Sequence, residues 1–465
     1  MSVRGTGAAL VTLALCGTMT ARADFEAAMR DYNAGRYDAA HAQFLALAEL
    51  GDCSSQFNLG AMALKGQGGP KDTGSGVGWL QAAAGNGCEQ LVGNKLPALE
   101  ARLSPAESQT AAGIVARYGR EALLAEGVVN PDFRCEGSTP AGVLSSPTPD
   151  YPSRAATHHE AAIVITALSV GVDGLARDPE VLLALPGDGF AAAAIEAWLN
   201  SRFTPATRNG RAVESRLQAK TVFAVAGAGT YASADAFRLA RTAADAGDPQ
   251  AQYLLGLTAT LDPSLGISAA RGGQLLIGSA RGGDSDSQYW VGSQLLATST
   301  CHPHADGRVW LQHAAAGGNA SAQLLLAADL LRASPSTAQA AQARQLLENA
   351  AASDSYYVRK HITALLAASP VEAVRDPPTA LAVATKLAAG DIQSDPQMFE
   401  ALAAAHAANG DFRAAVSQQQ LAVHKAQQLG WDTREMNERL SAYRRNSAWR
   451  GDLLPLPPLS ERPAS

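Results

Sequence analysis

The side chains best suited to chemistry gather in two short stretches, and neither stretch has the spacing of a working site. Cys301-His302-Pro303-His304 offers three zinc ligands within four residues, but zinc sites usually need four ligands with a well-separated second pair. Pro303 favours a loop between helices. His158-His159-Glu160 lacks the spacing of a helical His-Glu-x-x-His zinc site. We therefore predict a plain loop at the first stretch, a solvated strand edge at the second, and no metal site.

Motifs for covalent and phosphate chemistry are missing from the sequence as well. It contains no nucleophile elbow, phosphate-binding loop or dinucleotide fingerprint, and no pair of acidic residues is placed to converge for acid–base catalysis. The formal net charge of −6 disfavours nucleic acid as a partner. We predict a protein that is not an enzyme, has no cofactor or small-molecule substrate, and binds other proteins.

A short sequence phrase recurs along the chain, and its period predicts the helices on which a binding surface would lie. Its glycines at 247, 283 and 318 are spaced by 36 and 35 residues. A period in this range is typical of solenoids built from helix pairs. The low aromatic content of 6% fits helices that stack closely through small side chains. The clear copies are Ala246–Gly256, Gly282–Gly292 and Gly317–Ala327, with a worn copy at Ser353–His361 and an early one at Leu50–Gly60.

The pattern divides the chain into parts. We predict helical repeats over 24–130 and 231–450, a Pro/Ser/Gly-rich linker over 131–150, and a disordered Pro-rich tail over 451–465. Between the helical blocks the texture changes to period-two alternation, which is typical of strands. The expected order there is a strand at Ala161–Val172, a strand at Pro179–Leu185, a helix at Phe190–Ser201 and a strand at Val213–Val225.

The repeats resemble the Sel-one-like repeat, a relative of the tetratricopeptide repeat. The residues that carry this resemblance in the first block are Gln56–Gly60, the loop Gly66–Asp72 and Trp79–Ala84. In the second block they are Gln252–Gly256, Gln288–Gly292 and Trp310–Ala316, and residues 395–430 look like a plain tetratricopeptide repeat. The resemblance implies an α/α solenoid that binds proteins.

The segment between the blocks resembles the C-terminal domain of TonB-family proteins. The order and spacing of several short motifs carry the resemblance: Tyr151–Ala155, Val170–Gly174, Phe190–Ala194 with Trp198, Arg202–Ala206 and Val222-Phe223. It departs from the family at Glu160-Ala161, where a Gly is favoured before the strand. The resemblance implies that the domain over 151–225 binds an extended segment of an outer-membrane receptor by strand addition. The partner-binding residues would be Val213, Arg216, Leu217, Gln218 and Phe223.

The first 23 residues have the features of a cleaved export signal. Arg4 precedes the apolar run Ala8–Cys16, and Ala21-Arg22-Ala23 is a small-x-small cleavage site. The apolar run is shorter than the roughly 20 residues of a membrane span. We predict a periplasmic or secreted protein. Lipidation of Cys16, which would anchor the chain to a membrane, is the less favoured alternative because Leu15 is a poor residue before a lipidated cysteine.

Export invites disulfides among the four remaining cysteines. Cys53 and Cys88 are 35 residues apart, near matching positions of neighbouring repeats, so a Cys53–Cys88 bridge is plausible. Equivalent atoms of stacked repeats can also lie too far apart to be bridged. Three pairings of the four cysteines therefore stay open.

The expected fold is mainly α: an α/α solenoid of helix-pair repeats in two blocks, with a small α/β domain inserted between them. The expected function is a periplasmic scaffold for protein–protein interaction, with partner proteins on the solenoid and a receptor segment on the inserted domain. One alternative is a TonB-family energy transducer in outer-membrane transport, which would need an uncleaved membrane anchor. The other is a regulator of a cell-envelope enzyme.

Overall fold

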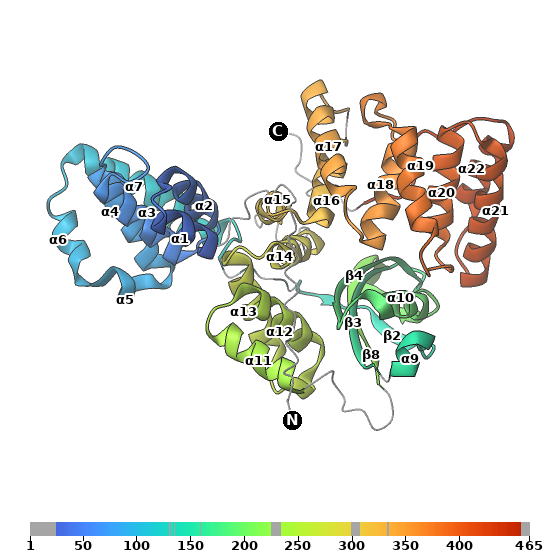
Figure 1. Cartoon of the computed structure of the whole chain (residues 1–465), viewed down its shortest axis with the longest axis horizontal. Helices are drawn as coiled ribbons and strands as arrows, with labels where there is room; N and C mark the ends of the chain where they lie inside the picture. Colours follow the sequence, from blue (N-terminus) through green and yellow to red (C-terminus); the bar gives the residue numbers. More distant parts are fainter. Residues whose placement is uncertain are drawn as a thin grey trace, which may run out of the picture.

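The structure is a computed structural model that describes residues 25–129, 131, 133, 135–158, 160–224, 234–298, 307–332 and 334–456. The predicted export signal, His159 and the Cys301–His304 stretch lie outside the described residues. Figure 1 shows a first group of helices in blue, a second group running from green to red, and a small sheet beneath the later helices of the second group. Within the described residues, no helix is both long and apolar enough to cross a membrane.

The first block is built from short helices that pack in consecutive pairs. Asp52 caps α3 by accepting a hydrogen bond from the Ser55 N–H, and Gly66 ends this helix in the left-handed region. Cys53 and Cys88 form a disulfide, one of the pairings that the sequence leaves open, with Cα atoms 5.6 Å apart. The helices of this block are α1 (Phe25–Asn33), α2 (Tyr37–Glu49), α3 (Cys53–Lys65), α4 (Thr73–Ala83), α5 (Glu89–Val92), α6 (Leu96–Glu100), α7 (Pro105–Tyr118) and α8 (Arg120–Ala125).

The second block continues the same architecture over twelve described helices. They are α11 (Ala234–Asp245), α12 (Pro249–Leu261), α13 (Ala269–Arg281), α14 (Ser285–Ala297), α15 (Gly307–Ala316), α16 (Ala320–Leu330), α17 (Thr337–Ala350), α18 (Tyr356–Ala368), α19 (Pro377–Ala388), α20 (Pro396–Ala408), α21 (Phe412–Leu429) and α22 (Arg434–Arg444). The predicted solenoid of helix pairs is confirmed.

The recurring phrase has a structural cause at each repeat. Its Asp or Asn caps the second helix of a pair, as Asp284 does for α14. Its Gln reaches back to a carbonyl at the end of the preceding helix: Gln288 Nε2 donates to Ala280 O at 3.0 Å. The same contact recurs at Gln56, Gln252 and Gln323. The phrase thus joins each helix to the one before it, which satisfies groups that a helix end leaves unpaired.

The glycines of the phrase let the paired helices cross closely. A Cβ atom added at Gly256 would lie 2.8 Å from Gly272 O, on the neighbouring helix. The first block repeats this crossing, because a Cβ at Gly60 would lie 2.9 Å from Gly76 O. Any side chain at these positions would push the helices apart, so glycine is required there by packing.

The inserted domain has a three-stranded antiparallel sheet in the order β4-β3-β8. One face of the sheet packs on α10, where Phe190, Phe223 and Tyr151 contact one another. The other face packs on the second block of repeats. The elements are β1 (Ser138–Thr139), β2 (Gly142–Ser145), α9 (Ser153–His158), β3 (Ala162–Val170), β4 (Ala176–Leu185), α10 (Ala191–Leu199), β5 (Arg202–Thr204), β6 (Ala206–Arg208), β7 (Arg211–Val213) and β8 (Ser215–Phe223).

Two boundaries differ from the sequence predictions. The expected linker over 131–150 contains β1 and β2, which pair with β6 and β5 of the inserted domain. The reason is that short extended segments can satisfy their main-chain groups on an open sheet edge, even when Pro and Ser dominate their composition. The second strand of the main sheet begins at Ala176, ahead of the predicted Pro179.

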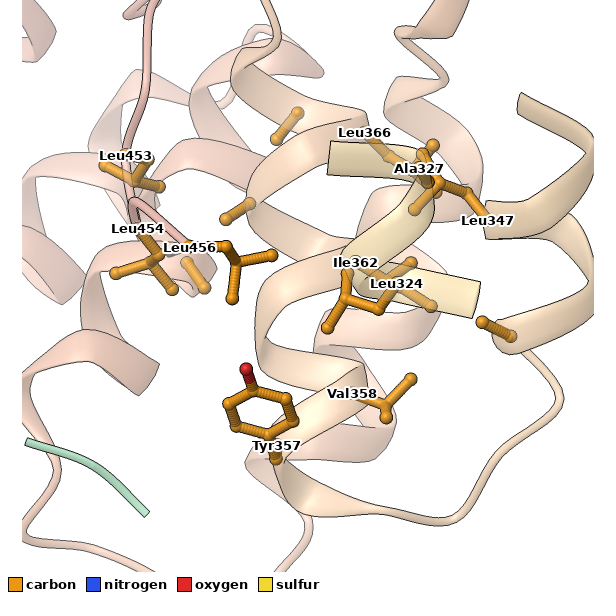
Figure 2. Close-up of a cluster of buried hydrophobic side chains, with 14 of the residues drawn as sticks. Leu324, Ala327, Leu347, Tyr357, Val358, Ile362, Leu366, Leu453, Leu454 and Leu456 are labelled. Atoms are coloured by element: carbon orange, nitrogen blue, oxygen red, sulfur yellow. The ribbon is translucent and has the colours of Figure 1, made fainter. Parts of the chain in front are cut away.

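The prediction of a disordered tail over 451–465 is also wrong for the first residues of this segment. Gly451 N donates to Ala368 O at 2.9 Å, at the end of α18. Figure 2 shows the tail leucines beside α18, which carries Tyr357. Burial of these leucines stabilises the start of the tail against the repeats, although a Pro-rich composition is typical of disorder. They are each 6–7% exposed: Leu453, Leu454 and Leu456.

The three parts of the chain meet in one apolar cluster. Trp310 belongs to this cluster and has no exposed surface, and Arg281 of the second block donates to Gly51 O of the first. Because the cluster draws side chains from both blocks and from β3, it fixes the first block and the sheet against the same helices. Its members include Leu50 and Leu123 from the first block, Ile163 and Ile165 from β3, and Leu276 and Trp290 from the second block.

Candidate functional site

Strand β4 lies along the inner helices of the second block, and the same position of three repeats, those of α12, α14 and α18, contacts it. This position is five residues after the residue that caps α12, α14 or α18. The contacted residues lie two apart along the strand; the contact at Leu182 is with its main-chain carbonyl, and those at Glu180 and Asp178 are with side chains. Tyr253 Oη donates to Leu182 O at 2.7 Å, Tyr289 Oη donates to Glu180 Oε2 at 2.7 Å, and Lys360 Nζ pairs with Asp178 Oδ1 at 3.1 Å.

A bulge in β4 aims Asp178 at the repeats. The register between β3 and β4 shifts between Ala167 and Ser169, and Asp178 has a φ of 53°. An aspartate tolerates this left-handed region better than most residues do, but a residue held there still costs on the order of 1–3 kcal/mol. The charged contacts of Asp178 offset that cost.

Lys360 is fully buried between two carboxylates from different parts of the chain. It lies 3.1 Å from Asp178 and 3.0 Å from Asp395, and neither Lys360 nor Asp395 has exposed side-chain surface. Burial alone lowers the pKa of Lys360, but the charges of Asp395 and Asp178 outweigh it and raise the pKa above its usual value. His361 Nε2 also lies 2.6 Å from Asp178.

The pKa of Asp178 shifts in the opposite direction. Burial alone raises it, but the charges of His361 and Lys360 and the hydrogen bond from His361 outweigh burial. The net result holds the pKa of Asp178 well below its usual range. Asp178 and Lys360 therefore both stay charged at neutral pH, as a buried ion pair across the junction between the sheet and the repeats.

Glu180 forms a second polar cluster two residues further along β4. It accepts hydrogen bonds from Tyr289 and from Ser321 Oγ, the latter at 2.6 Å, and it pairs with Arg216 of β8. Arg216 also lies over the ring of Tyr357, 5.4 Å from its centroid. Burial alone lowers the pKa of Arg216, but the charge of Glu180 outweighs it and raises that pKa. We define the docking cluster as Asp178, Glu180, Arg216, Tyr289, Lys360 and His361.

The residues predicted to bind a partner are only partly brought together. Val213 ends β7 and pairs with Ala206, whereas the other four lie on β8. Phe223 is 2% exposed in the core beneath α10, and Leu217 packs against the cluster around Leu168 on that same face. Arg216 belongs to the docking cluster. Of the five, Gln218 is half-buried and lies opposite Ala167 of β3 in the sheet.

Strand β8 is an edge strand of the sheet. β8 pairs with β3, and no described strand pairs with its other side. Val222 is 38% exposed on this strand, while Lys220 forms an ion pair with Asp262 of the repeats at 2.7 Å. The main-chain groups of β8, rather than its side chains, are what this edge offers to a partner.

The sequence interpretation missed the docking cluster, although the sequence carries a signal for it. The worn repeat copy has Lys360 and His361 where the clear copies have Tyr289 and Trp290, or Leu324 and Leu325. A lysine at an inward position of a repeat is almost never buried without a partner. Its partner, Asp178, lies 182 residues earlier in the chain, and no local pattern joins the two.

Comparison with known proteins gives one family match and two similar solved structures. Residues 147–225 match the family model described as Gram-negative bacterial TonB protein C-terminal. A Sel1 repeat protein from Oxalobacter formigenes is 21% identical, with 46% of this chain and 61% of that chain covered and a TM-score of 0.27. This chain thus spans about three fifths of that protein's length.

A protective antigen present in uropathogenic Escherichia coli strains, which displays an SLR fold, is 16% identical. The match covers 91% of this chain and 85% of that chain, with a TM-score of 0.32. Among the curated proteins, none matches this chain. The inserted domain is of the TonB C-terminal type, carried within a solenoid of helix-pair repeats.

Proposed function

We propose that the protein is a periplasmic interaction scaffold whose β8 edge receives an extended segment of an outer-membrane receptor. Two observations support this: the match of residues 147–225 to the TonB C-terminal family, and the place of β8 at the edge of the β4-β3-β8 sheet. Strand addition draws its affinity from main-chain hydrogen bonds. It can therefore proceed although Arg216 and Phe223 are engaged inside the protein.

The repeats supply the second half of the proposal. The inner face of the second block is occupied by β4, so we place the partner protein on the first block. Three apolar side chains of this block, Leu91, Val115 and Leu124, are 50%, 36% and 41% exposed and are available for contact with a partner.

A photo-crosslinking amino acid at Val222 tests the β8 edge in intact cells. We expect it to crosslink to an outer-membrane receptor, because a strand added to β8 passes within contact distance of this exposed side chain. The control is the same amino acid at Leu239, which is 66% exposed on α11. Identical products from both positions would refute the proposal.

N-terminal sequencing of the same protein should find Asp24 first, whereas an intact segment 1–23 would contradict a periplasmic scaffold.

Two neighbouring proline variants, Leu217→Pro and Gln218→Pro, provide a matched control. Adjacent residues of an antiparallel strand direct their N–H groups to opposite sides, so one variant removes a bond to β3 and the other removes a donor on the outer edge. An edge strand tolerates the loss of a donor on its outer edge, because that donor takes no part in pairing with β3. The variant that keeps the wild-type melting temperature should lose the Val222 crosslink. If it crosslinks as well as wild type, strand addition on β8 does not occur.

A further inference from the structure

A cavity of about 580 Å³ remains between β4 and the inner helices of the second block. Glu180, Val181 and Leu182 of β4 form one wall, and the first turns of α14, α16 and α18 form the other. The volume is within the range of about 300–1,000 Å³ that ligand sites occupy. The cavity lies on the β4 side of the sheet, at the edge opposite β8.

The strand wall offers main-chain groups. β4 is an outer strand of its sheet, and no described strand pairs with its far side. The carbonyl of Leu182 faces the repeats and is already engaged, since it accepts the hydrogen bond from Tyr253. An outer strand of this kind is a template for a further strand.

The helix wall is built to let a chain come close. Gly317, Gly318 and Ala320 leave the turn before α16 without bulk. The amide groups of Asn319 and Asn349 line the same wall. Asn319 uses both ends of its amide within the protein, donating to Asp286 and accepting from the Ala322 N–H, and Asn349 Oδ1 accepts from Gln345. The Nδ2 group of Asn349 is therefore the amide donor that this wall offers to a peptide carbonyl.

The cavity has one carboxylate without a compensating cation. Asp286 is exposed and accepts a hydrogen bond from Asn319 Nδ2 at 2.8 Å, and no lysine or arginine of the described residues pairs with it. Glu180 differs because Arg216 neutralises it. The net negative charge favours a ligand with a positive side chain.

We propose that this cavity binds an extended peptide that carries a lysine or arginine. The peptide main chain adds to the outer edge of β4, and its basic side chain lies at Asp286. The site is separate from the β8 edge and does not depend on it. It makes the protein able to hold two extended segments at opposite edges of one sheet.

Fluorescence anisotropy with model peptides and the full mature chain tests the proposal. The probe is a labelled acetyl-Thr-Val-Lys-Val-Thr amide, compared with a peptide that has glutamate in place of lysine and with one that is N-methylated at alternate residues. We expect saturable binding of the lysine peptide and affinities weaker by at least about tenfold for the other two. Asp286→Asn should reduce the preference for lysine over glutamate to below about threefold.

Ala352→Trp and Ala338→Trp form the matched pair of variants. Ala352 is exposed and lines the cavity, so a tryptophan there fills it, whereas Ala338 is exposed on α17 outside the cavity lining. Binding should be lost in the first variant and kept in the second. Absence of binding to wild type, binding that survives Ala352→Trp, or equal binding of the glutamate peptide would each overturn the proposal.

Discussion

Replacing Lys360 by methionine is expected to lower the free energy of unfolding by about 3–5 kcal/mol, because it leaves Asp178 and Asp395 charged in the protein interior. Methionine keeps most of the side-chain volume, so the loss reflects charge rather than a cavity. Lys386→Met is the control, since Lys386 is exposed on α19, and it should change the stability by less than about 0.5 kcal/mol. Urea denaturation followed by tryptophan fluorescence measures both variants.

The pH dependence gives the same prediction an independent check. The folded-state pKa of Asp178 is lowered, so its charge stabilises the fold above about pH 4, the unfolded value, and this contribution is lost as the pH falls through the folded pKa. The pKa of Lys360 is raised, so its contribution is full below about pH 10 and is lost above. The stability difference between wild type and Lys360→Met should therefore stay constant at neutral pH and shrink below about pH 4. A difference that is the same at pH 3 as at pH 7 would contradict the buried ion pair.

Trp310→Ala is expected to cost about 3–5 kcal/mol, the usual loss for a large buried aromatic side chain. Trp310 has no exposed surface, and its cluster joins the first block, the sheet and the second block. We expect the variant to become sensitive to limited proteolysis both near Leu50 and in β3, since the same cluster holds both segments. Proteolysis confined to the second block would show that the three parts are not joined there.

Trp310→Phe separates the apolar contribution from the polar one. The indole Nε1 of Trp310 has no hydrogen-bond partner in the described part of the chain, so phenylalanine gives up volume but no hydrogen bond. We expect a loss well below that of the alanine variant. An equal loss in both variants would mean that the cluster cannot adjust to any change of shape.

Most of the helical architecture could be predicted from the sequence, because the signals are local. The capping contact of Asp284 and the contact of Gln288 with Ala280 each join residues no more than eight apart, and both contacts recur in every clear repeat. The inserted sheet was also predictable, since the run Ala161–Val172 alternates partly at period two and the turn dipeptide Asp173-Gly174 follows it. The prediction failed for the tail, where Leu453, Leu454 and Leu456 pack on helices more than 80 residues earlier.

The candidate site was less predictable, for a different physical reason. The sequence interpretation placed the partner-binding residues on the last strand, and Arg216 proved to bind Glu180 within the protein. Composition does not show which face of a sheet a neighbouring domain covers. The inner face of the second block holds β4 through Tyr253, Tyr289 and Lys360, so that face receives a strand of its own chain.

The central claim is that the inserted sheet is fixed to the repeats through buried charges on β4. A double-mutant cycle between Asp178→Asn and Lys360→Met tests it most directly, because the two atoms in contact belong to different parts of the chain. The account predicts a coupling free energy of about 1–3 kcal/mol, with the double variant more stable than the sum of the single losses implies. Losses that add within about 0.5 kcal/mol would show that the two side chains do not meet in solution, and would contradict the docking of β4.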